Sequence, residues 1–574
     1  MFRTIFILAF LFVALPGMAQ KAFLPLQYEI SGELALKGTE VFKDSLSREQ
    51  MVRELIRDLQ NDGFLIAREI SRQHRSDTLV VSLETGLKYF WLELKTGNVK
   101  DDLLIKSGYD DRIFRGKPLS YKKVLSIFDG LIGTLEDNGY PFASIKLDSL
   151  SQEGTSLSAA LYYEPGPYIS FDTLKLIGAG SKTDAVYLAR LLQISPGTPF
   201  SQKKVNQSIA RIQNLPYLKL EGEPELSFQN NEAILYIPVQ DRKINILDGI
   251  IGFLPNEIEQ NKLLVTGQFD LALFNIAGRG RNFGVSWQRL SQLSQNLRIT
   301  AEEPLVLGSN IDVKASFFLL KEDSTFLNRD FRLDLGYRMA PSAYISFFSR
   351  RQSGDLLAVS QFSAAEVLPD IADFRYNNYG LHLDLNHLDD VFFPRRGWFG
   401  AMEFGIGNKR LIQNTGLPEV LYEDVNRNAV QYYINFRTEK HFYFTPKLGL
   451  MTAVNAGEMV SDNLLLNDMY RLGGLRSIRG FNENFIFANR YIYTNIEPRF
   501  YFDAYSYFMI FADMGNVTNK LSRGGNDWPF AFGSGFSMET TGGMFKFIYA
   551  VGQSQAQPLA FNYSRIHFGY TGRF

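Results

Sequence analysis

The sequence R-L-G-G-L-R-S-I-R-G-F, residues 471–481, lies about four fifths of the way along the chain and decides the fold. It contains three glycines and three arginines between segments that alternate like β-strands. Glycine allows positive φ and close backbone approach, and arginine carries a permanently charged planar fork that suits a carboxylate. From this stretch alone, a Gly-rich hairpin with surface arginines is an equally good interpretation. The neighbouring segments must therefore decide between the two.

Two strand-like segments follow the stretch, at residues 489–502 and 508–517. In the first, Glu497 shares a face with Tyr493, Asn495 and Arg499, and the opposite face carries Ile492, Thr494, Ile496, Phe500 and Phe502. In the second, Phe511 and Asp513 share the face opposite to a row of apolar residues. Successive side chains of a strand point to opposite faces, so in a membrane barrel these three residues are predicted to face the lumen.

Together these segments resemble the outer-membrane protein assembly factor and two-partner secretion family (BamA, TamA and FhaC types). In that family a similar motif forms the tip of a long extracellular loop that folds back into a barrel lumen. The resemblance implies that the loop tip here consists of Gly473, Gly474, Ser477, Ile478, Arg479, Gly480 and Phe481. It also implies that Arg479 contacts the acidic wall residues Glu497 and Asp513, with Phe511 beside them.

Composition excludes several classes of function. The 574 residues include 60 basic and 61 acidic side chains, so no basic surplus is available to bind nucleic acid. The absence of cysteine excludes disulfides, thiol nucleophiles and cysteine-ligated zinc. The five histidines are scattered, and neither G-x-S-x-G nor H-E-x-x-H occurs. We therefore expect no metal, no cofactor and no enzymatic activity.

The amino terminus predicts export. Residues 1–19 have a basic start, an apolar core at residues 5–15 and a small-residue end, which is typical of a signal peptide. A membrane helix needs about 18 uninterrupted apolar residues, and no later stretch of that kind occurs. Any membrane residence must therefore come from a β-barrel.

A weak internal repeat organises the part before the barrel. Residues 117–124 (K-P-L-S-Y-K-K-V) recur as residues 198–205 (T-P-F-S-Q-K-K-V), and residues 45–52 form a fainter copy. Each copy begins an apolar-periodic helix and is flanked by strand-like runs, which predicts units of strand, helix, helix, strand and strand. These α+β units resemble the polypeptide-transport-associated (POTRA) domains of the same family, and three of them give a layout closest to the TamA type. Their predicted bounds are residues 25–87, 88–168 and 169–243.

Residues 244–574 predict an antiparallel transmembrane β-barrel. Strand-like segments of about 10 or more residues alternate apolar and polar side chains, and about 16 such segments fit an even-numbered barrel. The loop that carries Arg479 then connects the eleventh and twelfth strands and is the sixth extracellular loop. Residues 389–397 (D-D-V-F-F-P-R-R-G) resemble a D-x-x-x-F-P-x-x-G strand–turn–strand segment of the family.

The last residues carry a further resemblance. Phe568, Tyr570 and the terminal Phe574 lie on one face of a strand, like the C-terminal signal by which outer-membrane barrels are recognised for insertion. This strand, at residues 566–574, must close the barrel against the first, near residues 245–253. Glycines in the first strand predict a weak edge there.

These observations predict a protein of a Gram-negative-type outer membrane, with its repeats in the periplasm. It would insert or translocate unfolded outer-membrane or secreted polypeptides through a seam between its end strands, in contact with outer-membrane lipid. Sheet edges of the repeats could pair with an incoming strand, or with a periplasmic or inner-membrane partner. Three alternatives stay open: a dedicated exporter of one secreted protein, a passive porin, and a barrel-anchored enzyme.

Overall fold

The structure is a computed structural model that describes residues 24–178, 180–255, 263–289, 294–322, 325–363, 365–423, 425–522, 525–540 and 542–574. The predicted signal peptide lies outside the described residues. The chain forms two compact units. The first comprises the described residues up to 170 together with residues 199–202, and the second comprises residues 171–198 and 203–574.

The first domain of the first unit is a four-stranded sheet with one helix. Its elements are β1 (Leu24–Ser31), β2 (Leu36–Phe42), α1 (Ser45–Asn61), β3 (Arg68–Arg75) and β4 (Thr78–Glu84), with the sheet order β2-β1-β4-β3. The predicted order of strand, helix, helix, strand and strand is wrong here, because strand β2 stands where the first helix was expected. Gly32, with φ of 119°, permits the turn from β1 into β2.

The second domain has two helices over a three-stranded sheet. Its elements are β5 (Phe90–Lys95), α2 (Asp101–Ser107), α3 (Tyr121–Glu136), β6 (Ser144–Glu153) and β7 (Ser156–Glu164), with the sheet order β5-β7-β6. Helix α3 starts at Ser120, whose hydroxyl accepts a hydrogen bond from the backbone N–H of Lys123 (3.4 Å). Its apolar stripe packs on the sheet and buries Val124, Ile127 and Leu131.

The third domain, apart from Ser170 and residues 199–202, belongs to the same compact unit as the barrel. Its elements are β8 (Ser170–Ile177), α4 (Ala185–Leu192), α5 (Gln202–Gln213), β9 (Leu218–Leu220), β10 (Glu225–Gln229) and β11 (Glu232–Asp241). The sheet has the order β10-β11-β8, and β9 pairs with the far end of β11. The central strand β11 buries one face of alternating apolar residues, which forms the core of the domain.

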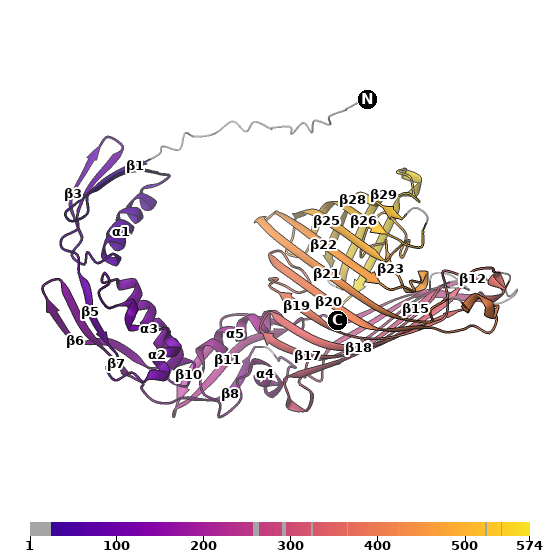
Figure 1. The fold of residues 1–574 in the computed structure, drawn as a ribbon, viewed down its shortest axis with the longest axis horizontal. Helices are drawn as coiled ribbons and strands as arrows, with labels where there is room; N and C mark the ends of the chain where they lie inside the picture. The colour runs from indigo at the N-terminus through magenta and orange to yellow at the C-terminus, as the bar shows by residue number, and fades with distance from the viewer. Residues whose placement is uncertain are drawn as a thin grey trace. The chain divides into compact units, whose positions relative to one another are not determined.

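The carboxy-terminal part is a single antiparallel sheet that curves into a barrel (Figure 1). Its strands are β12 (Ile246–Pro255), β13 (Leu263–Ile276), β14 (Arg281–Arg289), β15 (Gln295–Glu303), β16 (Ile311–Glu322), β17 (Phe326–Ala340), β18 (Ala343–Leu356), β19 (Phe374–Asn386), β20 (Gly397–Leu411), β21 (Asn428–Thr445), β22 (Leu448–Val460), β25 (Arg490–Tyr501), β26 (Tyr507–Thr518), β27 (Asn526–Asp527), β28 (Phe530–Thr540), β29 (Gly543–Gln553) and β30 (Arg565–Gly572). Of these 17 strands, β27 has only two residues, so the barrel has the sixteen long strands that were predicted.

The strands alternate between an apolar outer face and a polar inner face. In β17 the outward side chains are exposed, with Phe331 at 49% and Leu335 at 46%, whereas Asp334 between them is 7% exposed. This pattern is expected where the outside meets lipid and the inside is polar, and it confirms the predicted alternation. No helix of the described residues is both long and apolar enough to cross a membrane, a finding that does not bear on strands.

The third domain docks onto the turn between β13 and β14. The Asp184 side chain caps α4, and its backbone N–H donates to the Gly278 carbonyl (2.9 Å). Thr183 Oγ1 accepts from Asn275 Nδ2 (2.8 Å). Gly278 and Gly280 have positive φ (73° and 70°), and a Cβ atom on either would collide with the third domain. The turn therefore requires glycine for both its shape and its close packing.

Candidate functional site

The loop of residues 461–489 connects β22 and β25, the eleventh and twelfth long strands, as predicted. Within it, the short strands β23 (Tyr470–Leu472) and β24 (Ile486–Ala488) pair with each other. Gly473 and Gly474 then turn the chain with φ of 110° and 85°. The Ser477 hydroxyl accepts from the backbone N–H of Gly473 (2.7 Å) and donates to its carbonyl (2.9 Å), which closes the turn.

Arg479 at the tip of this loop is bound by two carboxylates of the barrel wall. Its Nε and Nη2 donate to the two oxygens of Asp513 (2.9 and 2.7 Å), and its Nη1 donates to Glu497 (2.7 Å). Its backbone N–H also donates to Asp513 (2.9 Å). The guanidinium lies over the Phe511 ring, 3.6 Å from the ring centroid. The structure thus brings together the four residues that the family resemblance connects.

This cluster is buried and balanced in charge. Arg479 is 5% exposed, Glu497 3% and Asp513 0%. Arg499, in β25, donates from Nε to the second oxygen of Glu497 (2.8 Å), so two guanidiniums face two carboxylates. Burial would lower the pKa of the Arg479 guanidinium, but hydrogen bonds and the charges of Asp513 and Glu497 outweigh it and raise this pKa. The ion pairs therefore hold Arg479 charged inside the barrel.

Two apolar side chains flank the arginine and fix the tip. Ile478 and Phe481 are both fully buried, in one cluster with wall residues of β25, β26 and β28. Gly480 has φ of 88°, and a Cβ there would lie 2.8 Å from the backbone N of Gly552 in β29. Only glycine allows this close approach of loop and wall.

Gln557, which the sequence did not single out, ties the tip to the last hairpin of the barrel. It lies in the loop between β29 and β30 and is 3% exposed. Its Nε2 donates to the carbonyls of Gly480 (3.0 Å) and Gly552 (2.9 Å). A single glutamine in an irregular loop belongs to no periodic sequence pattern. Its role becomes visible only from its contacts with the loop tip in the structure.

The base of the same loop is bound to a different part of the wall. Lys409 in β20 forms an ion pair with Asp468, and both side chains are almost completely buried. Lys409 Nζ also donates to the Asn463 carbonyl (2.5 Å). Arg471 Nη1 donates to Glu322 at the end of β16 (3.0 Å). The loop therefore spans the lumen, with its base and its tip held by different strands.

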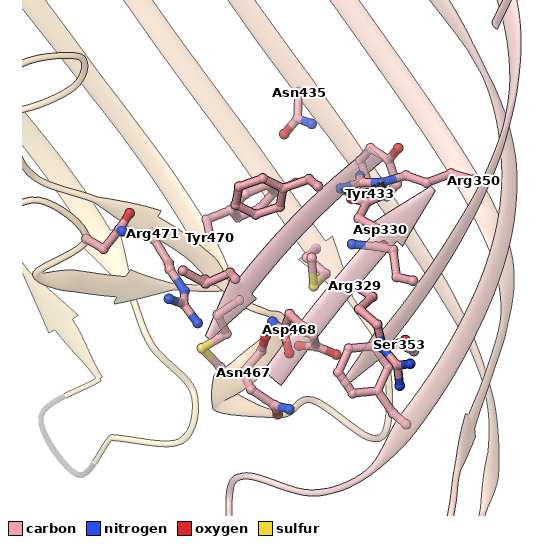
Figure 2. A pocket seen from close by; sticks show the side chains of 18 residues that line it. Arg329, Asp330, Arg350, Ser353, Tyr433, Asn435, Asn467, Asp468, Tyr470 and Arg471 are labelled. Atoms are coloured by element: carbon pink, nitrogen blue, oxygen red, sulfur yellow. Dashed lines mark hydrogen bonds and ion pairs between the residues drawn. The ribbon is translucent and has the colours of Figure 1, made fainter. Parts of the chain in front are cut away.

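A cavity of about 270 Å³ lies between the loop base and the wall strands β16, β17 and β18. Figure 2 shows loop residues such as Asp468, Tyr470 and Arg471 on one side and the wall residues Asp330 and Arg350 on the other. The lining combines these charged side chains with apolar ones such as Phe318 and Met459.

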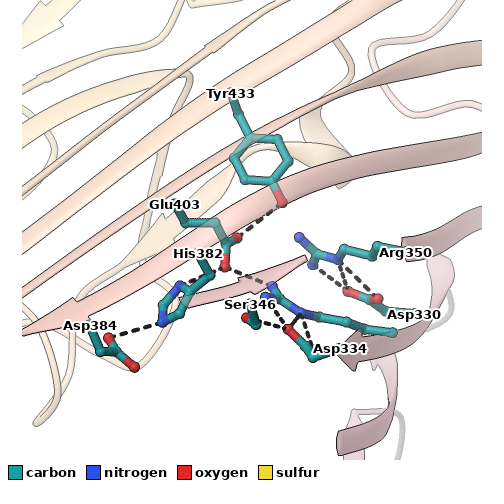
Figure 3. A network of polar contacts seen from close by, with 9 residues as sticks. Asp330, Asp334, Ser346, Arg350, His382, Asp384, Glu403 and Tyr433 are labelled. Carbon is teal, nitrogen blue, oxygen red and sulfur yellow. Dashed lines mark hydrogen bonds and ion pairs between the residues drawn. The ribbon is translucent and has the colours of Figure 1, made fainter. Parts of the chain in front are cut away.

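Further along the wall, charged side chains from neighbouring strands form a network (Figure 3). Arg332 of β17 binds Asp334 and Glu403 (2.7 Å each), and Glu403 also contacts His382 of β19 (3.3 Å) and the Tyr433 hydroxyl (3.0 Å). Charge-paired side chains of β17, β19 and β20 thus stabilise this part of the wall. Among the described residues, no group of three or more acidic, histidine or cysteine side chains could hold a metal ion.

The first and last strands meet in a sparsely bonded seam. All ten residues of β12 pair with β13, and all eight residues of β30 pair with β29. Between the ends of β12 and β30, the described residues show one antiparallel bridge, from Ile246 to Arg573, and the hydrogen bond from the Phe574 N–H to the Asn245 carbonyl (3.1 Å) belongs to it.

The residues of the predicted C-terminal signal lie on the outer face of β30 and at its end. Phe568 is 67% exposed, Tyr570 40% and Phe574 54%. They are not part of the loop site, and their role as an insertion signal stays a prediction.

Comparison with known proteins agrees with this architecture. The model of the Omp85 superfamily domain matches residues 275–574. A search of the curated proteins finds no match. Among solved structures, CdiB from Escherichia coli is similar with a TM-score of 0.56 at 12% identity, covering 92% of this chain and 97% of that one. CdiB from Acinetobacter baumannii has a TM-score of 0.52 at 12% identity, covering 92% and 98%. These likenesses show the fold.

A third structure, BamA from Haemophilus ducreyi lacking POTRA domains 1-3, has a TM-score of 0.41 at 14% identity and covers 84% of this chain and 99% of that one. None of these structures is described as a TamA protein, so the TamA-like layout stays a prediction.

Proposed function

The chain belongs to the Omp85 superfamily, and from this membership we propose that it inserts or translocates outer-membrane or surface polypeptides through the seam between β12 and β30. The barrel would lie in the outer membrane, with the three α+β domains in the periplasm. Unfolded outer-membrane or secreted polypeptides would be its substrates, and lipid would meet the opened seam.

The observation that carries this proposal is the sparse pairing across the seam. A single antiparallel bridge joins the ends of β12 and β30 in the described residues, whereas their other neighbours pair along the whole strand. A backbone hydrogen bond contributes only about 0.5 to 1.5 kcal/mol net. Breaking the hydrogen bonds between these strands therefore costs little, and each exposed edge can then accept an added strand through main-chain hydrogen bonds.

The loop tip supports the same function from inside the barrel. Arg479 holds the loop against β25 and β26, and Gln557 connects it to the hairpin that ends in β30. We propose that this cluster keeps the strands next to the seam in a fixed geometry while β30 separates from β12. The loop residues are thus positioning residues, and no catalytic step is assigned to them.

Depletion of the protein, followed by a census of outer-membrane and secreted proteins, tests the proposal. Loss of several barrel proteins from the membrane would support insertion. Loss of one secreted protein, with the outer membrane otherwise unchanged, would favour the dedicated exporter. An unchanged census of both fractions would overturn both functions.

A passive porin is a different class of function, and the loop argues against it. Residues 461–489 span the lumen and are bound at base and tip, which obstructs an open pore. A steady large conductance of the purified protein in a planar bilayer would favour the porin. Low or intermittent conductance is expected for a barrel that opens sideways.

A further inference from the structure

The turn between β19 and β20 is shaped by its own acidic side chains. Asp390 Oδ1 accepts from the backbone N–H groups of Phe392 (2.7 Å) and Phe393 (2.9 Å). Asp389 Oδ1 accepts from the N–H groups of Arg395 (3.0 Å) and Arg396 (3.1 Å). Such side-chain to backbone bonds fix a turn without a strand partner. The two phenylalanine rings are therefore presented in a defined position.

The Phe392 ring contacts arginines from both ends of the barrel sequence. The Arg242 guanidinium, between β11 and β12, lies 5.6 Å from the ring centroid, and the Arg573 guanidinium, directly after β30, lies 5.7 Å from it. Arg573 also lies over Phe393, 4.7 Å from its centroid. Arg242 forms an ion pair with Asp390 (3.0 Å), the same residue that orients both rings.

The turn is also anchored on the far side, which makes it a fixed support. Arg395 Nη2 donates to the Asp503 carbonyl (3.0 Å) in the turn between β25 and β26. Its guanidinium lies over the Tyr501 ring, 4.7 Å from the centroid. Phe393 packs against Tyr505 of that turn, with ring centroids 4.9 Å apart. Movement of either barrel end relative to this support must break arginine–aromatic contacts.

We propose that Phe392 and Phe393, stacked with Arg242 and Arg573, form an aromatic clasp that holds the two ends of the barrel together and sets how often the seam opens. This inference rests on the proposed function of the seam and adds the residues that control it. Since the strands themselves share so few hydrogen bonds, cation–π contacts contribute a substantial part of the closing energy. Arg242 directly follows the third α+β domain, so a displacement of that domain would act on the clasp.

The clasp can be tested by hydrogen exchange of the intact protein in lipid nanodiscs, without any client. Exchange in peptides covering residues 240–247 and 565–574 reports how often the seam opens. Replacing both rings, by Phe392→Leu with Phe393→Leu, keeps most of the apolar volume and removes the π-faces. We expect about fivefold faster exchange in both peptides. Unchanged exchange in a folded variant would overturn the clasp.

Matched variants separate the clasp from general destabilisation. Phe393→Tyr keeps the ring and should behave as the parent protein. Phe399→Leu removes a ring that Arg437 stacks on, 5.7 Å from the centroid, away from the seam, and should leave seam exchange unchanged. Faster exchange in this control would assign the effect to the barrel as a whole and contradict the clasp.

A double-mutant cycle covers the case in which the paired ring replacement does not fold. Arg573→Gln and Phe393→Leu should each speed exchange, and combining them should add little, because both remove the same contact. Fully additive effects would contradict the stacking. Since no client is present, this result is independent of the depletion census: that census can fail while the clasp stands, and the clasp can fail while the census supports insertion.

Discussion

Arg479 is the residue on which the loop geometry depends. Its planar guanidinium donates hydrogen bonds from two nitrogens to Asp513 and from the third to Glu497. These two carboxylates come from neighbouring strands. A lysine carries the same charge but has no planar guanidinium. The arginine therefore fixes the direction in which the loop enters the wall, as well as neutralising the carboxylates.

We predict that Arg479→Ala loosens the loop and impairs client assembly. The change leaves Asp513 and Glu497 buried with one cation fewer, at a cost of about 3 to 5 kcal/mol, or less where water enters. Limited proteolysis of the loop and an assembly assay in the depleted strain measure the outcome. Arg479→Lys is the control and should be intermediate. Parental protease resistance and activity in the alanine variant would contradict this role of the arginine.

The site residues differ in how far the sequence could predict them. Arg479 and its carboxylates could be named because a motif marks the loop and period-two alternation places Glu497 and Asp513 on the inner face. Gln557 and the Lys409–Asp468 pair could not be named. Their contacts join irregular loops to distant strands, and no local pattern encodes such pairing.

At the scale of elements, the loop of residues 461–489 is a strap fixed at both ends. The Lys409–Asp468 pair holds the base, and its side chains are 0% and 3% exposed. Burial raises the pKa of the Asp468 carboxyl, while Lys409 lowers it. The lysine is therefore what makes a charged aspartate tolerable at this position.

Replacing Lys409 by methionine should destabilise the protein by about 3 to 5 kcal/mol at neutral pH, because the buried Asp468 carboxylate loses its cationic partner. Without the lysine the folded-state pKa of Asp468 rises further above its unfolded value. The variant should then regain stability as the pH falls, because the neutral carboxyl is favoured in the fold. Urea unfolding across pH measures this. If the Lys409→Met variant instead lost more stability as the pH fell, the prediction would be contradicted. Adding Asp468→Asn to Lys409→Met should restore part of the stability lost at neutral pH.

The contact between the third domain and the barrel makes a separate prediction. Gly280→Ala would place a Cβ 1.9 Å from the Tyr187 hydroxyl at a positive φ, and should cost about 1 to 3 kcal/mol. Gly154→Ala is the control, because Gly154 also has positive φ (60°) but open space around it. Thermal unfolding compares the two. Equal effects would show that backbone strain, and not docking, limits stability.

The elements themselves were predictable to different degrees. Helix α3 follows from its apolar period and serine cap, and the long barrel strands follow from their alternation. Strand β2 was missed because it is a short edge strand. Its residues Leu36 and Val41 are 49% and 56% exposed, so burial imposes no clear pattern on it.

For the whole molecule, the number of strands and the position of the seam could be predicted, but the contacts that close the seam could not. The length of about 20 residues per strand and turn gives sixteen strands over residues 244–574. How β12 meets β30 depends instead on contacts between the two ends of the barrel sequence, which are far apart along the chain. The glycines of the first strand indicate a weak edge, but no local sequence signal places the bridge at Ile246 and Arg573.

The most direct measurement of the central claim is activity with the seam covalently closed. The chain has no cysteine, so Leu247→Cys with Gly572→Cys introduces a unique pair. A Cβ on Gly572 would lie 3.0 Å from the Leu247 carbonyl oxygen, so the two strands are adjacent there. We predict that the oxidised protein stays folded but inactive, and that reduction restores activity, while each single-cysteine variant stays active throughout. Full activity of the locked barrel would contradict the account.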